Sequence, residues 1–381
     1  MNFMKTYLFF LCIIFSAYVS AQSQKDQAEK YIRYGQYSNA IQTLKSIPDT
    51  IRNDSINQEL NYWLENLYLL EKNWNAIIAL HKQMKVSDSD TSILTMARLF
   101  SKFPEEQIKF TSKAFPIEFK LSMTKTPKIS VWVNGHKYTF WVDTGAGMTV
   151  LSSKTARDCN IKMSADKNAS TTAATGKSLA ISYGVIDSLR FGQIEAKNHT
   201  CLIIDKKQLE FKIAGIRMFK IDGIIGWNLL QELAVTIHRN PNTILFAPSE
   251  KEAVVNPNFF WMSYPLVSCA DSSGNPLIFG FDTGAASSSL HNAILSKTDT
   301  TKAVHKKEII GSAGGNVKIT TLTFPQIKIF ADGKKIVLHN ASIHPSSEKG
   351  IFAPDGTLGW KELLDYTVYF DFRKGVFRLE N

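Results

Sequence analysis

The stretch FWVDTGA at residues 140–146 decides the fold of this chain, because a close copy, IFGFDTGA, occupies residues 278–285. Both copies place Asp-Thr-Gly directly after a run of apolar residues, with the aspartates at positions 143 and 282. One carboxylate does little hydrolytic chemistry alone, whereas two that face each other can share a proton and activate water. A single Asp-Thr-Gly is a weak signal, but two in matching contexts indicate a pair of acids.

A polar turn that contains glycine follows each aspartate at the same distance. Asp143 and Asp282 are 139 residues apart, and so are Gly176 and Gly315 in the two turns. Glycine readily adopts the positive φ that a hairpin tip often needs. The equal spacing indicates that the chain contains an internal duplication.

Two further segments repeat with an offset of 133 residues. The stretch DGIIGWNLL at residues 222–230 is echoed by DGTLGWKELL at residues 355–364. Each echo leads into residues that alternate between apolar and polar, at 234–238 and at 367–372. Alternation of this kind is typical of strands with one buried face. The duplication therefore predicts two copies of one mostly β unit.

Taken together, the repeated motifs resemble those of retropepsin-like aspartic proteases of the pepsin and retropepsin superfamily. The resemblance covers residues 115–381 and implies a mainly β fold, in which two retropepsin-like β-barrel lobes form a bilobal acid protease. Residues 224–226, Ile-Ile-Gly, fit the apolar segment that packs beneath each loop in that family. Residues 357–359, Thr-Leu-Gly, depart from it at the first position. Alanine after each Asp-Thr-Gly is more similar to the retroviral dimer than to pepsin.

Four segments are expected along the chain. They are a signal peptide (1–21), a helical domain that resembles tetratricopeptide (TPR) repeats (22–112), a first protease lobe (113–250) and a second protease lobe (251–381). Lys5, the apolar run after it and the small residues before Gln22 are features of a secretory signal peptide. We therefore expect export, to the periplasm or as a secreted protein, with no stable membrane span after cleavage. An uncleaved anchor is the alternative.

The region before the protease lobes is predicted to be helical, because its apolar residues recur at helical spacing and glycine and proline are scarce. The tripeptide Asn-Ala-Ile at residues 39–41 recurs at 75–77, an offset of 36. That period resembles the TPR class of helical pairs, and a plain helical bundle would explain it as well. The region carries no obvious chemistry, so it would either bind a protein partner or cover one side of the protease unit.

Residues 117–142 alternate between apolar and polar, with Asn134-Gly135 between two strand-like runs. An Asn-Gly pair suits a tight hairpin turn, since both positions then have positive φ. The second copy has its hairpin turn at residues 272–276. Residues 248–262, which are polar at first and then contain Pro257, are interpreted as the linker between the lobes.

Composition excludes several classes of function. The chain has 381 residues and a formal charge of +10, but its lysines and arginines are scattered without a basic stripe, so no nucleic acid is expected. Three cysteines remain after signal cleavage, Cys159, Cys201 and Cys269, which is too few for a disulfide scaffold. They form either a Cys159–Cys201 bond or three buried thiols. The histidines show no metal-ligand spacing, and we expect neither a metal nor another cofactor.

The resemblance assigns catalysis to Asp143 and Asp282. The residues that would support the active-site loops are Thr144, Gly145, Thr283 and Gly284. Glycine permits a tight turn and offers its N–H to the carboxylate, and threonine can direct its hydroxyl to the opposite loop. Two close carboxylates retain one proton, so the ionised one can take a proton from water while the other donates a hydrogen bond to a peptide carbonyl. The expected substrate is a peptide or protein.

The turns that carry Gly176 and Gly315 are interpreted as substrate-binding flaps, which would close over a peptide and exclude water. Plain hairpin connections are the alternative. An extended substrate would lie between the flaps and the lobes and would bind through its backbone, with its side chains in alternating pockets.

Three functions suit a pair of acids. An aspartic endopeptidase is favoured, and a non-catalytic peptide- or protein-binding module on the same scaffold is the main alternative. A glycoside hydrolase also uses two carboxylates, but it has no need of a repeated Asp-Thr-Gly.

Ala146 and Ala285 stand where a serine or threonine could donate a hydrogen bond to the ionised carboxylate and lower the pKa of the pair. Without that donor, activity is expected at mildly acidic to near-neutral pH. A pH–rate profile that peaks below about pH 3 would contradict this expectation.

Overall fold

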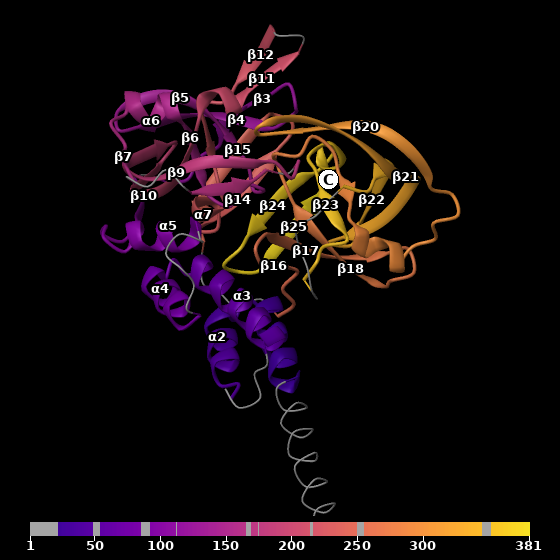
Figure 1. The fold of residues 1–381 in the computed structure, drawn as a ribbon. Coiled ribbons are helices and arrows are strands. Elements are labelled where there is room, and N and C mark those ends of the chain that lie inside the picture. The colour runs from indigo at the N-terminus through magenta and orange to yellow at the C-terminus, as the bar shows by residue number, and fades with distance from the viewer. Residues whose placement is uncertain are drawn as a thin grey trace, which may run out of the picture.

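The structure is a computed structural model, mainly β with an N-terminal helical region (Figure 1). It describes residues 22–48, 54–84, 92–111, 113–164, 169–173, 175–213, 216–249, 255–344 and 352–381. The predicted signal peptide, residues 1–21, lies outside the described residues. Within the described part of the chain, every helix is too short or too polar to cross a membrane.

The N-terminal region is a series of helices in which each packs on the next. It consists of a helix at residues 22–33, α2 (Tyr37–Lys45), α3 (Asp54–Leu70), α4 (Trp74–Gln83) and α5 (Ser92–Phe100). The turn before α2 has Gly35 at φ 68°, and the turn before α4 has Lys72 at φ 54°. These matching turns put the two Asn-Ala-Ile tripeptides on corresponding helices, and the TPR assignment stays a prediction.

The helical prediction ran to residue 112 and is wrong at its end. Helix α5 stops at Phe100, and residues Gln107–Phe110 form strand β1. Strand β1 pairs antiparallel with β10 (Ile194–Ile204), with Ile108 opposite Ala196. The alternation at 107–110 is only four residues long, too short to outweigh the helical pattern before it.

The first half of the β region (residues 107–249) contains a ten-stranded sheet. Its other strands are β3 (Lys120–Leu121), β4 (Pro127–Val133), β5 (His136–Val142), β6 (Thr149–Ser152), β7 (Lys162–Met163), β8 (Ser170–Thr172), β9 (Ser178–Phe191) and β13 (Gly223–Ile225). The main order is β1-β10-β6-β13-β5-β4-β9-β7, with β3 on β4 and β8 on β9. Helix α6 (Ser153–Asp158), the short helix η2 (Lys206–Leu209) and the hairpin of β11 (Glu210–Ile213) with β12 (Ile216–Lys220) complete this half.

The second half (residues 255–381) repeats the plan with an eight-stranded sheet. Its strands are β16 (Phe259–Trp261), β17 (Pro265–Asp271), β18 (Pro276–Phe281), β19 (Ser289–Leu290), β20 (Val304–Ser312), β21 (Gly315–Ala331), β22 (Lys334–Ser342) and β23 (Gly356–Leu358). The order is β19-β23-β18-β17-β21-β20, with β16 on β17 and β22 on β21. The short helices are η3 (Asn292–Ser296) and η4 (Lys361–Leu363). Strand β16 lies inside the segment interpreted as a linker, so that interpretation is wrong at residues 259–261.

A third sheet joins the two halves. It contains β2 (Ile117–Glu118), β14 (Leu233–His238), β15 (Thr243–Pro248), β24 (Thr367–Asp371) and β25 (Val376–Glu380), in the order β2-β15-β14-β24-β25. Strands β14 and β24 are the two alternating stretches of the sequence, and they pair antiparallel with Val235 opposite Phe370. Each half therefore supplies strands to one continuous sheet.

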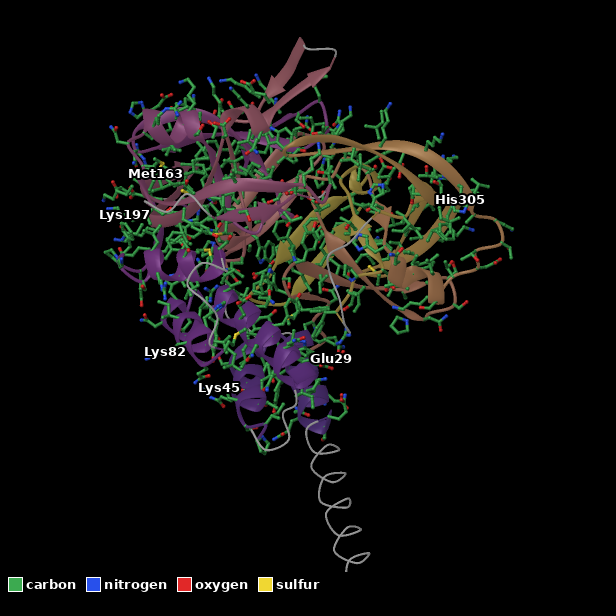
Figure 2. The ribbon with its side chains drawn as sticks, in the orientation of Figure 1. Glu29, Lys45, Lys82, Met163, Lys197 and His305 are labelled. Carbon is green, nitrogen blue, oxygen red and sulfur yellow. The ribbon has the colours of Figure 1, made fainter. Side chains whose placement is uncertain are left out.

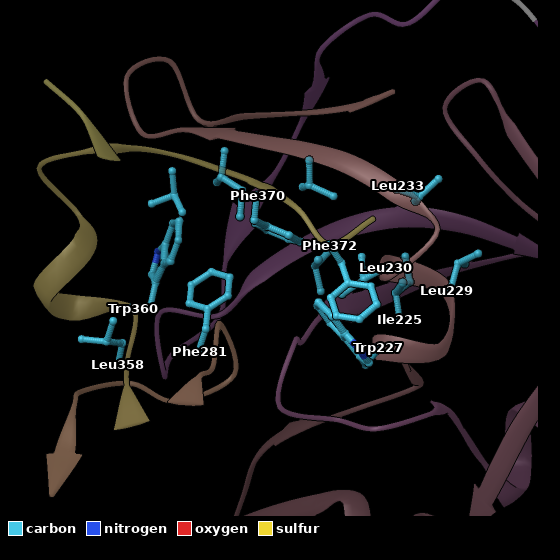
Figure 3. Close-up of a cluster of buried hydrophobic side chains, with 14 of the residues drawn as sticks. Ile225, Trp227, Leu229, Leu230, Leu233, Phe281, Leu358, Trp360, Phe370 and Phe372 are labelled. Carbon is cyan, nitrogen blue, oxygen red and sulfur yellow. The ribbon is translucent and has the colours of Figure 1, made fainter. Parts of the chain in front are cut away.

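Aromatic residues from both halves form the core above this sheet (Figure 3). Trp227, in helix α7 (Trp227–Leu230), is 1% exposed, and its ring makes an edge contact with Phe372 at 5.3 Å. Phe281, at the end of β18, lies 5.2 Å from Phe370 between ring centroids. Burying large side chains from both repeats in one cluster stabilises the two halves as a unit.

Charged side chains lie mainly on the outer faces. Figure 2 shows Lys45 and Lys82 on the helices, Lys197 on β10 and His305 on β20, and all four are exposed. Cys159, Cys201 and Cys269 are buried free thiols, which decides against the Cys159–Cys201 bond.

A buried ionic cluster connects the helices to the first half. Lys72 Nζ, between α3 and α4, lies 2.5 Å from Glu106 Oε2 and 3.3 Å from Glu232 Oε1. The other Glu106 oxygen contacts His199 Nδ1, and His199 Nε2 lies 2.7 Å from Thr149 Oγ1. Burial would raise the pKa of Glu106, but His199 and Lys72 outweigh it and lower the pKa to about 2.

Replacing Glu106 by Gln should lower the free energy of unfolding by about 3 kcal/mol at neutral pH, because the fully buried His199 and the half-buried Lys72 would both lose this carboxylate and only Lys72 would keep another, Glu232. A lowered pKa contributes stability above the ordinary value of 4.5 and loses it as the pH falls toward 2. The difference between wild type and variant, measured by urea denaturation, should therefore shrink below about pH 4. Asp158→Asn, which removes the exposed partner of Lys154, is the control and should change little. An equal loss at all pH values would contradict the ionic role.

Candidate functional site

The two Asp-Thr-Gly loops lie at the ends of corresponding strands. Asp143 follows β5 and Asp282 follows β18. The Asp143 N–H donates to the Ile225 carbonyl at 3.1 Å, and the Asp282 N–H donates to the Leu358 carbonyl at 3.0 Å. Strand β13 pairs parallel with β5, and β23 pairs parallel with β18, so each aspartate leaves its sheet at a fixed point. The two repeats position their acids by the same backbone contacts.

The threonines of the two loops exchange hydrogen bonds across the interface. The Thr283 N–H donates to Thr144 Oγ1 at 3.0 Å, and the Thr144 N–H donates to Thr283 Oγ1 at 3.1 Å. Each hydroxyl then donates to a carbonyl of the opposite strand, Thr144 to Phe281 at 2.7 Å and Thr283 to Val142 at 2.8 Å. Both threonines are 0% exposed. These four bonds lock the loops together with twofold symmetry.

Each glycine of the motif lies against the opposite carboxyl group. A Cβ at Gly145 would stand 2.5 Å from Asp282 Cγ, and one at Gly284 would stand 2.4 Å from Asp143 Cγ. Any side chain at either position would collide with the acid of the other loop. The glycines are therefore required by the close approach as well as by the turn.

Each carboxylate accepts two backbone hydrogen bonds from its own loop. Asp143 Oδ1 accepts from Gly145 N at 2.9 Å and Ala146 N at 3.2 Å. Asp282 Oδ1 accepts from Gly284 N at 2.7 Å and Ala285 N at 3.0 Å. The pair is thus held from below, and the remaining oxygens face each other.

The two acids are unequal. Burial and then the charge of Asp282 raise the pKa of Asp143 well above its ordinary 3.8, although the backbone donors oppose this. Burial also raises the pKa of Asp282, but hydrogen bonds from Asp143, Gly284, Tyr264 and Ala285 all act to lower it. Two carboxyl groups that hydrogen-bond to each other share one proton.

The Gly-Trp echoes pack directly beneath the loops. A Cβ at Gly226 would lie 2.2 Å from the Met148 carbonyl carbon, and one at Gly359 would lie 2.3 Å from that of Ser287. The Trp227 N–H donates to the Ala146 carbonyl at 2.7 Å. The equivalent bond in the second half joins Trp360 to Ala285 at 2.9 Å. Thr357, where the sequence departs from the family pattern, has a polar partner for its side chain. Its hydroxyl lies 3.2 Å from His291 Nε2.

A side-chain brace supports each loop from the same side. In the first half the Thr149 N–H donates to Asn228 Oδ1 at 2.8 Å, and Thr149 Oγ1 accepts from Gly226 N. In the second half Ser288 N and Oγ both donate to Glu362 Oε2 at 2.8 Å, and Ser288 Oγ accepts from Gly359 N. The chemistry differs, but both braces fix the distance between loop and echo.

The turns at Gly176 and Gly315 are hairpin tips, with φ of 77° and 106°. The first joins β8 to β9, and the second joins β20 to β21, whose long hairpin arches toward the first half (Figure 1). Thr175 N lies 3.2 Å and Thr175 Oγ1 lies 3.0 Å from Ser312 Oγ. The structure therefore brings the two tips together.

A lysine of the first tip crosses to the second. Lys177 Nζ donates to the carbonyls of Gly314 at 3.2 Å and Asn316 at 3.3 Å. All of these bonds are polar and part-buried or exposed, so they can exchange with water at modest cost.

Two functional candidates escaped the sequence analysis, Thr126 and Tyr264. Thr126 Oγ1 donates to the Gly284 carbonyl at 3.3 Å, and the Tyr264 hydroxyl hydrogen-bonds to the Asp282 carboxylate. The pair therefore does have a side-chain donor, contrary to the expectation drawn from the alanines. Each of these residues comes directly before a proline, in Lys-Thr-Pro at 125–127 and Ser-Tyr-Pro at 263–265, and this shared pattern could have identified them from the sequence.

Two other polar residues near these elements, Asp355 and Tyr183, lie outside the pair. Asp355 is fully buried, accepts from Ile278 N at 2.8 Å and pairs with Lys297. Tyr183 is 3% exposed and packs on Phe100, away from a hairpin tip. In the described part of the chain, three or more His, Cys, Asp or Glu side chains nowhere gather as a metal site would need.

A surface hollow of about 430 Å³ lies elsewhere, on the outer side of the first half. It is lined by Lys137, Tyr138, Thr139, Lys154, Lys220 and Asp222. None of its lining residues belongs to an Asp-Thr-Gly loop or a hairpin tip. Its lysines are surface residues, and Asp222 is already paired with Lys220 at 2.9 Å.

The raised pKa of Asp143 makes its protonation part of the folding free energy. The stability that it contributes is present below the ordinary value of 3.8 and is lost as the pH rises through the raised value. Asp143→Asn keeps a neutral group there at every pH. The variant should therefore be no more stable than the wild type at low pH. Between the pKa of Asp143 in the unfolded state and its pKa in the folded state, the variant should gain about 1.4 kcal/mol over the wild type for each pH unit. Thermal melts across pH measure this, and a variant that melts lower at every pH would contradict it.

Comparison with known families relates this site to one of them. Residues 129–229 match the family model described as Aspartyl protease. A search of curated proteins finds no match to the chain. The matched segment runs from β4 to α7 and contains Asp143, the first hairpin tip and the first Gly-Trp segment, whereas Asp282 and the N-terminal helices lie outside it. The match supports a relation between the first half of the β region and the retropepsin-like aspartyl proteases.

Proposed function

We propose that the protein is an aspartic endopeptidase, which hydrolyses peptide bonds with a water molecule activated between Asp143 and Asp282. The observation that carries the proposal is the pair itself. Two Asp-Thr-Gly loops are locked by four threonine bonds, with each carboxyl group against the opposite glycine. In this proposal the two halves of the β region are the two lobes of one retropepsin-like unit.

The reaction follows from one proton on two acids. The ionised carboxylate takes a proton from water, and the water oxygen attacks the carbonyl carbon of the peptide. The protonated carboxyl group gives its proton to the carbonyl oxygen, which forms a neutral gem-diol. The carboxyl group that took the proton from water then gives it to the nitrogen as the C–N bond breaks, and a gem-diol hydroxyl returns its proton to the other carboxylate, so that a carboxylic acid and an amine leave and the pair again holds one proton. No covalent bond to the enzyme forms.

The substrate in this proposal is an extended stretch of peptide. It lies between the acid pair and the hairpin tips, where strands β8, β9, β20 and β21 offer backbone groups for pairing. Contact between the tips, through Thr175, Lys177 and Ser312, closes the site and excludes water from the reaction.

The spacing of the acids disfavours the glycoside hydrolase hypothesis. The two carboxyl groups are in direct hydrogen-bond contact. Glycosidases of the retaining type hold their carboxyl groups about 5 Å apart, and inverting enzymes hold them still farther apart. A sugar ring does not fit between acids that touch.

We further propose that the chain is exported through its signal peptide and acts in the periplasm or as a secreted enzyme. The helical region would act mainly as a cover for the protease unit, because it buries residues against both halves. The second role that we propose for the helical region is binding of a protein partner on the outer side of its helices.

The direct test is peptide cleavage by wild type, Asp143→Asn and Asp282→Asn, with a diverse peptide library across pH. Each variant should lose at least about a thousandfold in kcat/KM, because neither acid can act alone. The control is Asp187→Asn, because Asp187 is exposed, and this variant should cleave peptides as the wild type does. Asp355→Asn would not serve as a control, because Asp355 is a buried structural group. Binding of peptides without cleavage by the wild type would support the non-catalytic module instead. A statine-type peptide analogue should inhibit the wild type.

A cysteine pair tests the flaps. In Thr175→Cys/Ser312→Cys, oxidation should join the two tips and abolish cleavage of a folded or long substrate, and reduction should restore it. Each single substitution is the control, and mass spectrometry would verify the crosslink. Full activity of the crosslinked protein would show that peptides enter by another path.

A further inference from the structure

Both halves carry an unusual turn just before the strand that pairs with the acid-bearing strand, β4 beside β5 and β17 beside β18. Lys125 has φ 70° and Ser263 has φ 63°, a conformation that side chains other than glycine rarely adopt. Each is followed by one polar residue and a proline, so that Thr126 and Tyr264 stand in equivalent places. In both turns the proline opens the next strand and pairs back onto the strand before it, although the first turn is two residues longer. Leu121 pairs with Pro127 in the first turn, and Trp261 pairs with Pro265 in the second.

The two equivalent places are filled in opposite ways. In the first half, residue 126 is a small threonine and the neighbouring strand has the bulky Trp141. In the second half, Tyr264 is bulky and the neighbouring strand has Gly280, which is the counterpart of Trp141 at an offset of 139. A Cβ at Gly280 would lie 2.4 Å from Tyr264 Cε1. The ring of Tyr264 therefore rests on a surface that only glycine provides.

Gly280 stands in β18 two residues before Asp282, so alternation along the chain puts both residues on one side, and the ring of Tyr264 against Gly280 lies on the side of the acid. A hydrogen bond from the Tyr264 side chain is one of the contacts that act to lower the pKa of Asp282. Thr126 donates instead to the Gly284 carbonyl and does not serve Asp143 in this way. Asp282 thus accepts from a side chain in addition to its two backbone donors, and this breaks the symmetry of the pair.

The helical region fixes the turn that carries Tyr264. Ser263 Oγ lies 2.7 Å from the Tyr62 hydroxyl and donates to Asn66 Oδ1 at 2.9 Å, both on helix α3. Asn66 is 7% exposed, and its own amide donates to the Tyr62 carbonyl at 2.8 Å. These bonds hold Ser263 in its positive-φ conformation, and they hold Tyr264 beside it against rotation of the turn.

We propose that Tyr264 is a positioning residue of the acid pair: its hydroxyl stabilises Asp282 as the carboxylate, so that the shared proton resides on Asp143, and helix α3 keeps Tyr264 in place through Ser263. The inference rests on the proposed function, because it assigns the base to Asp282 and the acid to Asp143. A hydrogen bond donated to a carboxylate favours its ionised form and does not help a protonated one.

The test is the pH profile of Tyr264→Phe, which keeps the ring and removes the hydroxyl. Without the donor, ionisation of the pair becomes harder, so the acidic limb of kcat/KM should move to higher pH by about one unit, and kcat should fall more than KM changes. Tyr366→Phe removes a hydroxyl that bonds to the Lys335 carbonyl and should leave the profile unchanged. A Tyr264→Phe profile that matches the wild type, with only a loss of stability, would overturn the proposal.

A second measurement separates this inference from the proposed function. Thermal melts at neutral pH of wild type, Tyr264→Phe, Asp282→Asn and the double variant form a cycle that needs no substrate. Removal of the hydroxyl should cost more stability beside the native carboxylate than beside the amide that Asp282→Asn introduces. Equal costs in both backgrounds would overturn the inference whether or not the protein cleaves peptides. If the costs differ and the wild type cleaves nothing, the proposed function fails alone.

The role of the helices is tested by Asn66→Ala. The loss of the Ser263 partner should loosen the turn and give a smaller shift of the acidic limb in the same direction as Tyr264→Phe. Asn39→Ala, on the exposed side of α2, is the matched control. An Asn66→Ala protein with an unshifted limb would remove helix α3 from the proposal and leave Tyr264 acting alone.

Discussion

The reciprocal bonds between Thr144 and Thr283 are the constraint on which the rest of the structure depends. They set the separation of the two loops, and that separation brings each carboxyl group onto the glycine of the opposite loop. Once the loops are fixed in this way, the strands that enter them have fixed ends. The Gly-Trp segments must then approach the loops closely enough to exclude a Cβ at Gly226 and Gly359. The third sheet and the aromatic core hold the two halves at the distance that the threonines require.

The helical region belongs to the same rigid unit. Its ionic cluster reaches His199, which contacts Thr149 just beyond the first aspartate loop. At the other side, α3 binds Ser263 in the turn next to the second aspartate. Helix α5 touches the hairpin of β8 and β9, where Ser92 Oγ accepts from Ser170 N at 2.8 Å. The helices thus contact both halves close to the two Asp-Thr-Gly loops.

Repetition made much of this structure predictable from the sequence. The two loops, the hairpin at Asn134-Gly135 and the strands at residues 234–238 and 367–372 follow from local patterns that occur twice or at a fixed period, whereas the pairing of these two strands was not predicted. Strands β1 and β16 were missed, because four and three residues carry too little periodicity. Tyr264 was missed for another reason. Its role depends on a positive φ at Ser263 and on a glycine in the neighbouring strand, and neither is visible until the strands are paired.

The same repetition creates a problem that substitutions in one half solve. A perfectly symmetric pair would leave the proton equally on either acid, whereas hydrolysis needs one base and one acid at the same moment. The first half combines a small Thr126 with a bulky Trp141, and the second half combines a bulky Tyr264 with Gly280. In the inference drawn above, this exchange of large and small residues makes the two acids unequal and leaves the bonds between Thr144 and Thr283 in place. A peptide has a direction, and only one direction places its carbonyl oxygen at the protonated acid. If the protein is the peptidase proposed above, an asymmetric pair favours the substrate orientation that places the carbonyl oxygen at the protonated acid.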